Sequence, residues 1–174
     1  MYHEIERKFL IRKMPRLSGV TPVRNERYFL QSGDLVEERI QSNGNVFEYE
    51  LKTAVSPREW SREKRNISES EFRNLASKSS KMLIRESYLL SEKSPRISVM
   101  RYKGTYLGLD LCEVEFDSME EFDSFVPLNW MGTEITNSPF GRESKLITLD
   151  REHFLRLLTI EKDILENGIS VGSL

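Results

Sequence analysis

The chain has 174 residues, with 26 Lys and Arg against 28 Asp and Glu, and its formal net charge is −2 at pH 7. This length predicts one domain, spanning 1–174, with a hydrophobic core of its own. The balanced charge gives no basic field of the kind that nucleic-acid-binding proteins carry, so we expect no specific nucleic-acid partner. A single cysteine, Cys112, excludes an internal disulfide and cysteine-rich zinc sites, and two histidines supply few ligands for a histidine-based metal site.

Two further features of the composition bound the class of protein. The sequence contains neither a signal-peptide pattern nor an apolar run long enough to span a bilayer, which predicts a cytoplasmic protein without a membrane partner. Charged residues make up 31% of the chain and recur inside segments that otherwise look like strands. Strand interiors are normally depleted in Glu and Lys, so this pattern indicates strands with one charged face.

The first expected strand begins close to the N-terminus and contains Ile5 and Phe9. Side chains alternate between the two faces of a strand, so Glu4, Glu6 and Lys8 share one face. Neighbouring carboxylates repel each other unless a cation neutralises them, and hard divalent ions such as Mg²⁺ prefer oxygen ligands of this kind. The alternative interpretation is a solvated charged face, which is the usual origin of such a pattern.

Further along the chain, β-prone runs alternate with turn signals. Residues 12–23 contain two prolines and a glycine and have no clear period, which predicts a loop. Asn43-Gly44 between two β-prone runs is a strong hairpin signal. Expected strands after the loop cover residues 27–30, 35–40, 46–52, 60–67, 83–90, 96–103 and 106–116, with a loop or short strand at 132–138.

Three helices are expected. Ser68 and Ser118 each precede a glutamate by three residues, which is the capping-box pattern, and predict short helices to about 78 and over 121–126. The third helix, at about 150–167, has an apolar stripe through Phe154 and Leu158 that is typical of core packing. Gly168 is its expected end.

These elements predict an α+β protein, mainly β, with six to eight antiparallel strands. A two-layer sandwich would leave the repeated charges of Lys8, Arg39, Lys52 and Arg85 without a common place. A closed barrel with charge inside and apolar residues outside, under helices, accommodates them. Buried like charges are costly, so such a lining requires cations that face anions or a charged ligand.

The order of these segments resembles that of the CYTH superfamily, the triphosphate tunnel metalloenzymes. Glu4-Ile5-Glu6-Arg7-Lys8 matches the N-terminal ExExK signature of that family. The similarity continues in order through Arg39, Leu51-Lys52, Ser61-Arg62, Arg85, Cys112-Glu113-Val114-Glu115-Phe116 and Trp130-Met131-Gly132-Thr133-Glu134. The resemblance implies a closed eight-stranded antiparallel tunnel, with helices outside, that binds a triphosphate chain and one or two divalent ions.

The resemblance also implies roles for individual residues. Mg²⁺ or Mn²⁺ would be held by the carboxylates Glu4, Glu6, Glu113 and Glu115. A triphosphate-containing small molecule would be held by the cations Lys8, Arg39, Lys52, Arg62, Arg85 and, at one mouth, Lys145. Catalytic roles are assigned to Lys52, Arg85 and Glu63. The oligomeric state is left open, and a homodimer is among the alternatives.

Four positions depart from the pattern of the family. Gln41 and Ser87 stand where arginines are expected, and Lys64 and Asn66 stand where carboxylates are expected. Glu63 is one residue out of step, which places it on the opposite strand face unless a bulge intervenes.

A second E-x-E-x-K pattern, at residues 48–52, offers a compensation for the lost carboxylates. Our hypothesis is that Glu48 or Glu50 supplies the missing carboxylate. The alternative is that both only balance Arg39 and Lys64 across the tunnel.

Three functions are compatible with this sequence. The first is metal-dependent hydrolysis of inorganic triphosphate or another short triphosphate. The second is a tunnel that binds polyphosphate or nucleotide with little or no turnover, because carboxylates have been lost. The third is an activity like that of class IV adenylyl cyclases, which needs a nucleoside pocket that the sequence does not identify.

Overall fold

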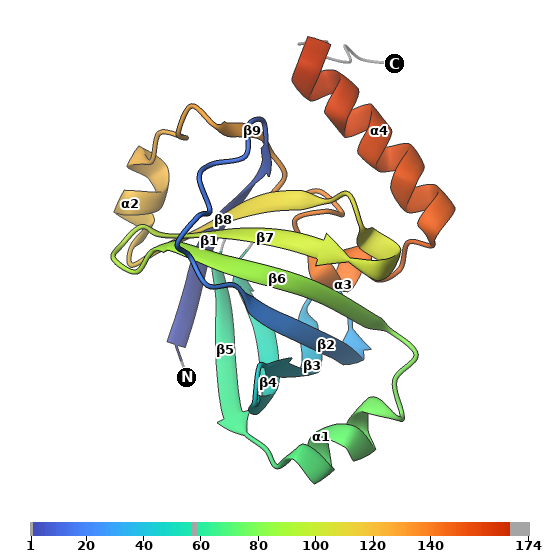
Figure 1. Cartoon of the computed structure of the whole chain (residues 1–174). Helices are drawn as coiled ribbons and strands as arrows, with labels where there is room; N and C mark the ends of the chain where they lie inside the picture. Colours follow the sequence, from blue (N-terminus) through green and yellow to red (C-terminus); the bar gives the residue numbers. More distant parts are fainter. Residues whose placement is uncertain (1, 57–58, 168–174) are drawn as a thin grey trace.

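The computed structural model describes residues 2–56 and 59–167, and in this part of the chain eight antiparallel strands form a closed barrel (Figure 1). The ring order is β1-β5-β4-β3-β2-β6-β7-β8, and a ninth strand, β9, pairs with the end of β1. The strands are β1 (Tyr2–Ile11), β2 (Val23–Ser32), β3 (Val36–Asn43), β4 (Val46–Ser56), β5 (Glu59–Asn66), β6 (Met82–Ser91), β7 (Arg96–Lys103), β8 (Asp110–Phe116) and β9 (Met131–Glu134). The predicted closed, mainly β fold is confirmed.

Strand β1 closes the barrel because its two halves pair with different neighbours. Near its start it pairs with β5, where Glu4 lies opposite Trp60. From Ile5 onward it pairs with β8, where Glu6 lies opposite Glu115 and Lys8 opposite Glu113. The signature residues of β1 therefore lie beside the glutamates of β8 on the inner wall of the barrel.

The helices are α1 (Glu69–Ala76), α2 (Met119–Ser124), α3 (Glu143–Leu146) and α4 (Arg151–Asn167), with a 3-10 turn, η1, at Gly104–Tyr106. Both capping boxes form: the Oγ atoms of Ser68 and Ser118 accept hydrogen bonds from the backbone N–H of Glu71 and Glu121, at 3.1 and 3.2 Å. Because Ser118 is the N-cap, α2 starts directly after it and ends two residues earlier than expected.

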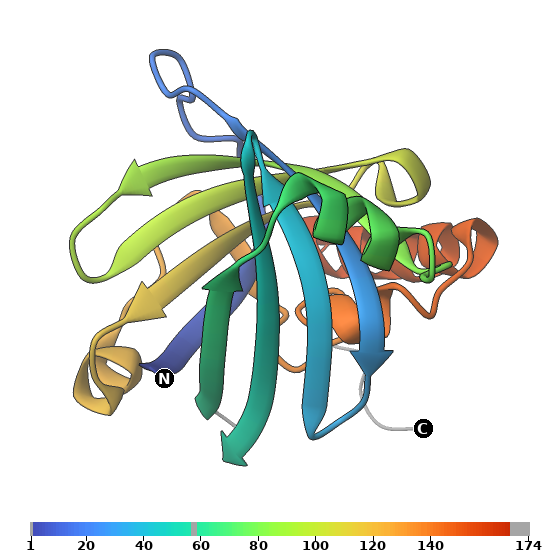
Figure 2. The same cartoon turned by 90° about the horizontal axis from the view of Figure 1, so that it is seen from below.

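Helices α1 and α2 lie on the outside of the barrel (Figure 2), and each packs an aromatic side chain against the strands. Phe72 of α1 packs edge-on against Tyr28 of β2 at 5.7 Å between ring centroids, and lies 5.0 Å from Phe47 of β4. Phe122 of α2 packs against Phe116 of β8 at 5.6 Å. The outward side chains of the strands therefore supply part of the hydrophobic core, as the alternation predicts.

One end of the barrel interior is apolar, which corrects the expectation of a charged tunnel throughout. Leu10, Met100 and Leu111 continue the inward alternation of their strands beyond the charged residues. They join a buried cluster with Phe140, from the segment that follows β9, and Phe154 of α4. The charged part of the interior is consequently closed at this end by packed side chains.

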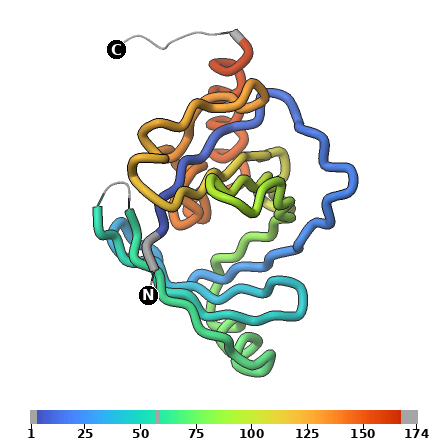
Figure 3. The backbone as a smooth tube through the Cα atoms, turned by 90° about the vertical axis from the view of Figure 1, so that its left-hand side faces the viewer, coloured from blue at the N-terminus to red at the C-terminus, as the bar shows by residue number. Residues whose placement is uncertain are grey.

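Several local details differ from the expected elements. The strand expected from residue 106 begins at Asp110, because η1 and Gly108, at φ 107°, form a turn before it. Strand β9 begins one residue before the segment expected to be a loop or short strand and overlaps it, and α3 was not expected. The loop between β1 and β2 extends outward from the barrel (Figure 3).

Helix α4 spans Arg151–Asn167, which agrees with the helix expected at about 150–167. Its expected end at Gly168 lies outside the described residues. Among residues 2–56 and 59–167, none of the helices combines the length and the apolar character needed to cross a membrane.

Candidate functional site

A charged cavity of about 260 Å³ lies inside the barrel. Nine cationic and six carboxylate side chains line it, so positive charge is in excess at the surface that a ligand would meet. The cations are Lys8, Arg27, Arg39, Lys52, Arg62, Lys64, Arg85, Arg96 and Arg142, and the carboxylates are Glu4, Glu6, Glu37, Glu113, Glu115 and Glu143. A cavity with this balance favours an anionic ligand.

Three arginines on β2, β3 and β6 surround one carboxylate at the inner end of the cavity. Arg27, Arg39 and Arg85 form what we call the arginine cluster, and Glu143 of α3 lies among them. The Oε2 atom of Glu143 lies 2.5 Å from Nη1 of Arg27, and its Oε1 atom lies 2.7 Å from Nη1 of Arg85. Burial alone would raise the pKa of Glu143, but the nearby Arg27, Arg85 and Arg39 hold it well below its ordinary value.

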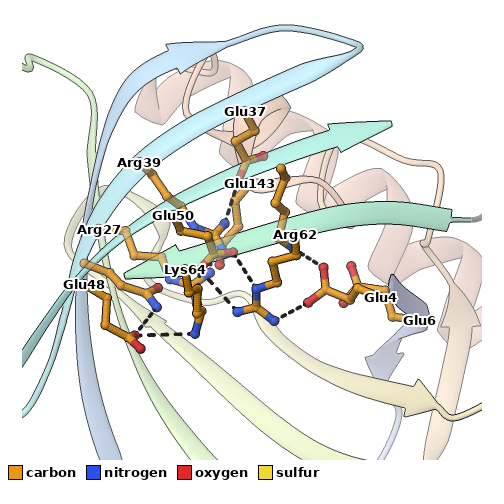
Figure 4. Close-up of polar contacts among 12 residues, drawn as sticks. Glu4, Glu6, Arg27, Glu37, Arg39, Glu48, Glu50, Arg62, Lys64 and Glu143 are labelled. Atoms are coloured by element: carbon orange, nitrogen blue, oxygen red, sulfur yellow. Dashed lines mark hydrogen bonds and ion pairs between the residues drawn. The ribbon is translucent and has the colours of Figure 1, made fainter. Parts of the chain in front are cut away.

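A second buried carboxylate, Glu50 of β4, joins β3 to β5 (Figure 4). Its Oε1 atom lies 2.8 Å from Nη2 of Arg39 and 2.8 Å from Nε of Arg62, and the side chain is completely buried. Burial opposes its ionisation, yet Arg39 and the neighbouring cations lower its pKa. Glu48 accepts from Gln41 at 2.7 Å and lies 3.4 Å from Nζ of Lys64. Both glutamates are thus engaged by neighbouring groups, which favours the charge-balance alternative.

Four glutamates on β1 and β8 form what we call the carboxylate wall: Glu4, Glu6, Glu113 and Glu115. Glu4 accepts from Nη1 of Arg62 at 2.7 Å and also pairs with Lys52, which joins the wall to β4 and β5 (Figure 4). Nζ of Lys8 lies 2.8 Å from Oε1 of Glu6 and 3.4 Å from Oε2 of Glu113. Burial alone would lower the pKa of Lys8, but these two carboxylates raise it above its ordinary value.

The surroundings of Glu115 differ from those of Glu113 in the same carboxylate wall. For Glu113, burial opposes ionisation but Lys8 and Arg85 lower the pKa. Burial, together with the neighbouring Glu4 and Glu113, raises the pKa of Glu115 above its ordinary value. Carboxylate oxygens are the ligands that Mg²⁺ and Mn²⁺ prefer, and a divalent ion would offset the repulsion between Glu115 and its neighbouring carboxylates. Within the described residues, no three His, Cys, Asp or Glu side chains are already grouped to hold a metal ion. The donor set of the wall fits such an ion, but the wall is not a preassembled site.

The structure gathers most of the expected site residues in one cavity. Nine of the expected residues line this cavity: Glu4, Glu6, Lys8, Arg39, Lys52, Arg62, Arg85, Glu113 and Glu115. A tenth, Glu50, does not line the cavity and lies behind Arg39. Lys145 does not line the cavity; it is half-exposed and its Nζ lies 3.4 Å from Oδ1 of Asp34.

Glu63 does not reach the cavity either, so the structure places it away from the residues beside which it was expected to act. It is exposed, while Arg62 and Lys64 on either side of it line the cavity. β5 pairs with β4 in register through this stretch, without a bulge, so strand alternation directs Glu63 to the outer face.

Neutral side chains replace charge next to the arginine cluster. Ser87 donates to Oδ1 of Asn25 at 2.7 Å, and Asn25 donates to Asn43 at 2.6 Å. Asn43 and Gln41 both donate to Glu48, at 2.6 and 2.7 Å. The two positions that lack the arginines of the family pattern are therefore part of a connected polar network.

Two residues at the inner end of the cavity, Arg27 and Glu143, were not expected there from the sequence. Arg27 could have been found by alternation, because Asn25 and Arg27 share the inward face of β2. Glu143 had no usable signal, because it lies in a four-residue helix whose position depends on tertiary packing.

A second hollow, of about 610 Å³, adjoins the charged cavity and shares Glu6, Trp60, Gly141 and Arg142 with it. The guanidinium carbon of Arg142 lies 4.8 Å from the centre of the Trp60 ring. Leu35, Ala54 and Val55 contribute apolar surface to this hollow. The sequence alone did not identify such a space beside the tunnel.

Comparisons with known proteins identify similar structures. No protein-family model matches the sequence, and no curated protein matches it. The crystal structure of the inorganic triphosphatase NE1496 superposes with a TM-score of 0.62 at 24% identity, over 86% of this chain and 97% of that one. A candidate adenylate cyclase from Bacillus halodurans superposes with a TM-score of 0.51 at 16% identity, over 74% of this chain and 96% of that one. The PH1012 protein from Pyrococcus horikoshii gives 0.51 at 12% identity, over 69% and 82%. At these identities the likeness concerns the fold.

Proposed function

Because the chain has the CYTH-type triphosphate tunnel fold, we propose that it hydrolyses inorganic triphosphate, or another short linear triphosphate, in a metal-dependent reaction. The observation that carries this proposal is the charged cavity, in which cations outnumber carboxylates and four of the carboxylates share one wall. Cations on the other strands match phosphate oxygens, and the carboxylate wall matches a divalent ion that binds together with them.

Ligand binding would replace ion pairs between side chains of the cavity with contacts to phosphate and metal. Lys8 and Lys52 pair with Glu6 and Glu4, and would instead contact phosphate oxygens. This exchange would free the two glutamates for Mg²⁺ or Mn²⁺, so we expect metal and triphosphate to bind cooperatively. A bound divalent ion would polarise phosphate oxygens and offset the charge that develops on the leaving group.

The size of the cavity favours an inorganic substrate. Its volume of about 260 Å³ lies just below the range of roughly 300–1,000 Å³ that is usual for pockets that bind drug-sized ligands. The organic part of a nucleotide would have to extend into the adjoining hollow beside Trp60. Inorganic triphosphate needs no such extension.

Binding without turnover is the second candidate, and the surroundings of Arg62 favour it. Lys64 replaces an expected carboxylate and lies 3.7 Å from Glu50, which is itself paired with Arg39 and Arg62. Few carboxylates outside the carboxylate wall are therefore free to orient an attacking water. Anion binding depends on the cations, so it would survive this loss better than hydrolysis.

Phosphate release from inorganic triphosphate, with Mg²⁺ or Mn²⁺, distinguishes the two candidates. We expect metal-dependent release by the wild type, and a loss of at least about tenfold in Glu4→Gln, since groups that only support metal ligands already have effects of that size. Glu63→Gln is the matched control on the outer face and should retain the wild-type rate. Binding of triphosphate is measured in parallel by calorimetry. Binding without phosphate release supports the second candidate. If the protein shows no binding and no release, both candidates are refuted.

A further inference from the structure

Glu143 holds the position that a phosphoryl group would take in the arginine cluster. Its Oε2 atom accepts from Nη1 of Arg27 at 2.5 Å and from Nη1 of Arg39 at 3.4 Å. Its Oε1 atom accepts from Nη1 of Arg85 at 2.7 Å and from the hydroxyl of Tyr102 at 2.8 Å. Three guanidinium groups and a hydroxyl that converge on two oxygens resemble the donor set of a phosphate-binding site.

The arginine cluster is not saturated by its internal carboxylates. Arg27, Arg39 and Arg85 are each more than nine-tenths buried, and among the described residues their Nε atoms have no hydrogen-bond partner. Burial, followed by the charges of Arg39 and Arg85, lowers the pKa of Arg27 even with Glu143 in place. The cluster therefore has donors and positive charge beyond those that Glu143 uses.

Packing on both sides fixes Glu143 in this position. Phe140 and Leu146 flank it in sequence and are both buried in the apolar cluster that closes the barrel. A Cβ atom at Gly141 would lie 2.0 Å from the carbonyl oxygen of Ile135, so the backbone before Glu143 passes tightly against its neighbour. Withdrawal of Glu143 would require these residues to unpack, which distinguishes it from a side chain on a mobile loop.

We propose that Glu143 is a built-in anion that closes the phosphate channel at the arginine cluster and thereby sets the length of the polyphosphate that the tunnel accepts. The inference rests on the proposed function, because it concerns the same cavity and the same class of ligand, linear inorganic polyphosphates. In the wild type, a phosphate chain reaches the cations nearer the carboxylate wall, such as Lys8, Lys52 and Arg62. Removal of Glu143 opens the arginine cluster to one additional phosphoryl group.

The first test is anion rescue, with inorganic orthophosphate as the probe. Glu143→Ala removes the carboxylate and leaves space, so its melting temperature should fall and should recover largely when orthophosphate is added. Glu37→Gln is the matched control, because Glu37 is also a buried carboxylate on Arg39, at 2.5 Å, but does not contact the other two arginines. The control and the wild type should gain much less from orthophosphate. Equal gains in all three proteins would overturn the inference.

The second test is chain-length preference, measured by calorimetry with tripolyphosphate and tetrapolyphosphate. In Glu143→Ala and Glu143→Ser, which both vacate the place of the carboxylate, the preference for the longer chain should increase about tenfold or more, as expected for added charge-assisted hydrogen bonds. Glu143→Gln, which keeps the shape of the side chain, and Glu143→Asp, which keeps the charge, should stay nearer the wild type. If Glu143→Ala does not fold, Glu143→Ser decides the question.

The outcomes separate the inference from the proposed function. Unchanged chain-length preference in variants that still bind tripolyphosphate would overturn the inference and leave the proposed function standing. A wild type that binds no polyphosphate would overturn the proposed function and, with it, the role of Glu143 in chain length.

Discussion

The arginine cluster and the carboxylate wall lie across the barrel from each other and differ in how their charges are compensated. In the ring order, β2 and β3 stand opposite β1 and β8. On the cluster side, Glu143 and Glu50 are ionised against several arginines, and their pKa values are lowered. On the wall side, the pKa of Glu115 is raised by burial and by neighbouring carboxylates, although Lys8 and Arg85 lower that of Glu113.

This difference suggests a separate role for each side: ion pairs on the cluster side stabilise the fold, and the wall side is suited to bind a cation. The carboxylates of the cluster side have their cations within the protein, so their ion pairs hold the strands together. In the carboxylate wall, Glu115 lies beside other carboxylates, so a cation from outside would stabilise its ionised form. A ligand that combines phosphates with a divalent ion matches both sides at once.

The largest change in stability should come from removing a cation that neutralises buried carboxylates on the cluster side. Arg39→Met leaves Glu37 and Glu50 buried without their shared partner, and should lower the free energy of unfolding by about 3–5 kcal/mol. Urea denaturation measures this change. Arg101→Met, at a half-exposed pair with Asp110, is the control and should cost less than about 1 kcal/mol. Similar losses in the two variants would remove the distinction between the sides.

The pH dependence of stability should be dominated by the same cluster. Glu50 and Glu143 have lowered pKa values in the folded protein, so their contribution is fully present above the unfolded carboxyl value of about 4.3 and is lost as pH falls below it. Thermal unfolding between neutral and acidic pH should show a decline that is shallower in Glu143→Gln. An equally steep decline in that variant would show that other carboxylates control acid unfolding.

The smallest change in stability is expected on the wall side, where a substitution can even raise the free energy of unfolding slightly. The raised pKa of Glu115 means that the folded protein stabilises its ionised form less than the unfolded chain does. Glu115→Gln should therefore leave the free energy of unfolding within about 1 kcal/mol of the wild type, or raise it slightly. A loss as large as that of Arg39→Met in the same urea experiment would mean that the charges of both sides are compensated alike.

Strand alternation made much of this arrangement predictable. It placed Glu4, Glu6 and Lys8 on one face, and the repeated charged faces required a closed barrel to receive them. The same rule places Glu63 on the outer face, as the structure shows. The catalytic role expected for Glu63 required an inward position.

The closed end of the cavity was not predictable from the sequence. Leu10 and Met100 continue the inward faces of β1 and β7, but only the folded chain shows that they meet Phe140 and Phe154 there. Glu143 reaches the arginine cluster because Phe140 and Leu146 anchor its segment in this apolar packing. No local pattern records that contact, since it joins residues more than a hundred positions apart, such as Arg27 and Glu143.

The most direct test of the account is a crystal structure with inorganic triphosphate and Mn²⁺, located by anomalous scattering. To limit turnover, crystals of the wild type are soaked briefly, and Glu115→Gln is examined in parallel. The account predicts the Mn²⁺ signal at the carboxylate wall, phosphates against Lys8, Lys52 and Arg62, and Glu143 still within the arginine cluster. A Mn²⁺ signal away from β1 and β8, or a triphosphate bound outside the barrel, would contradict it.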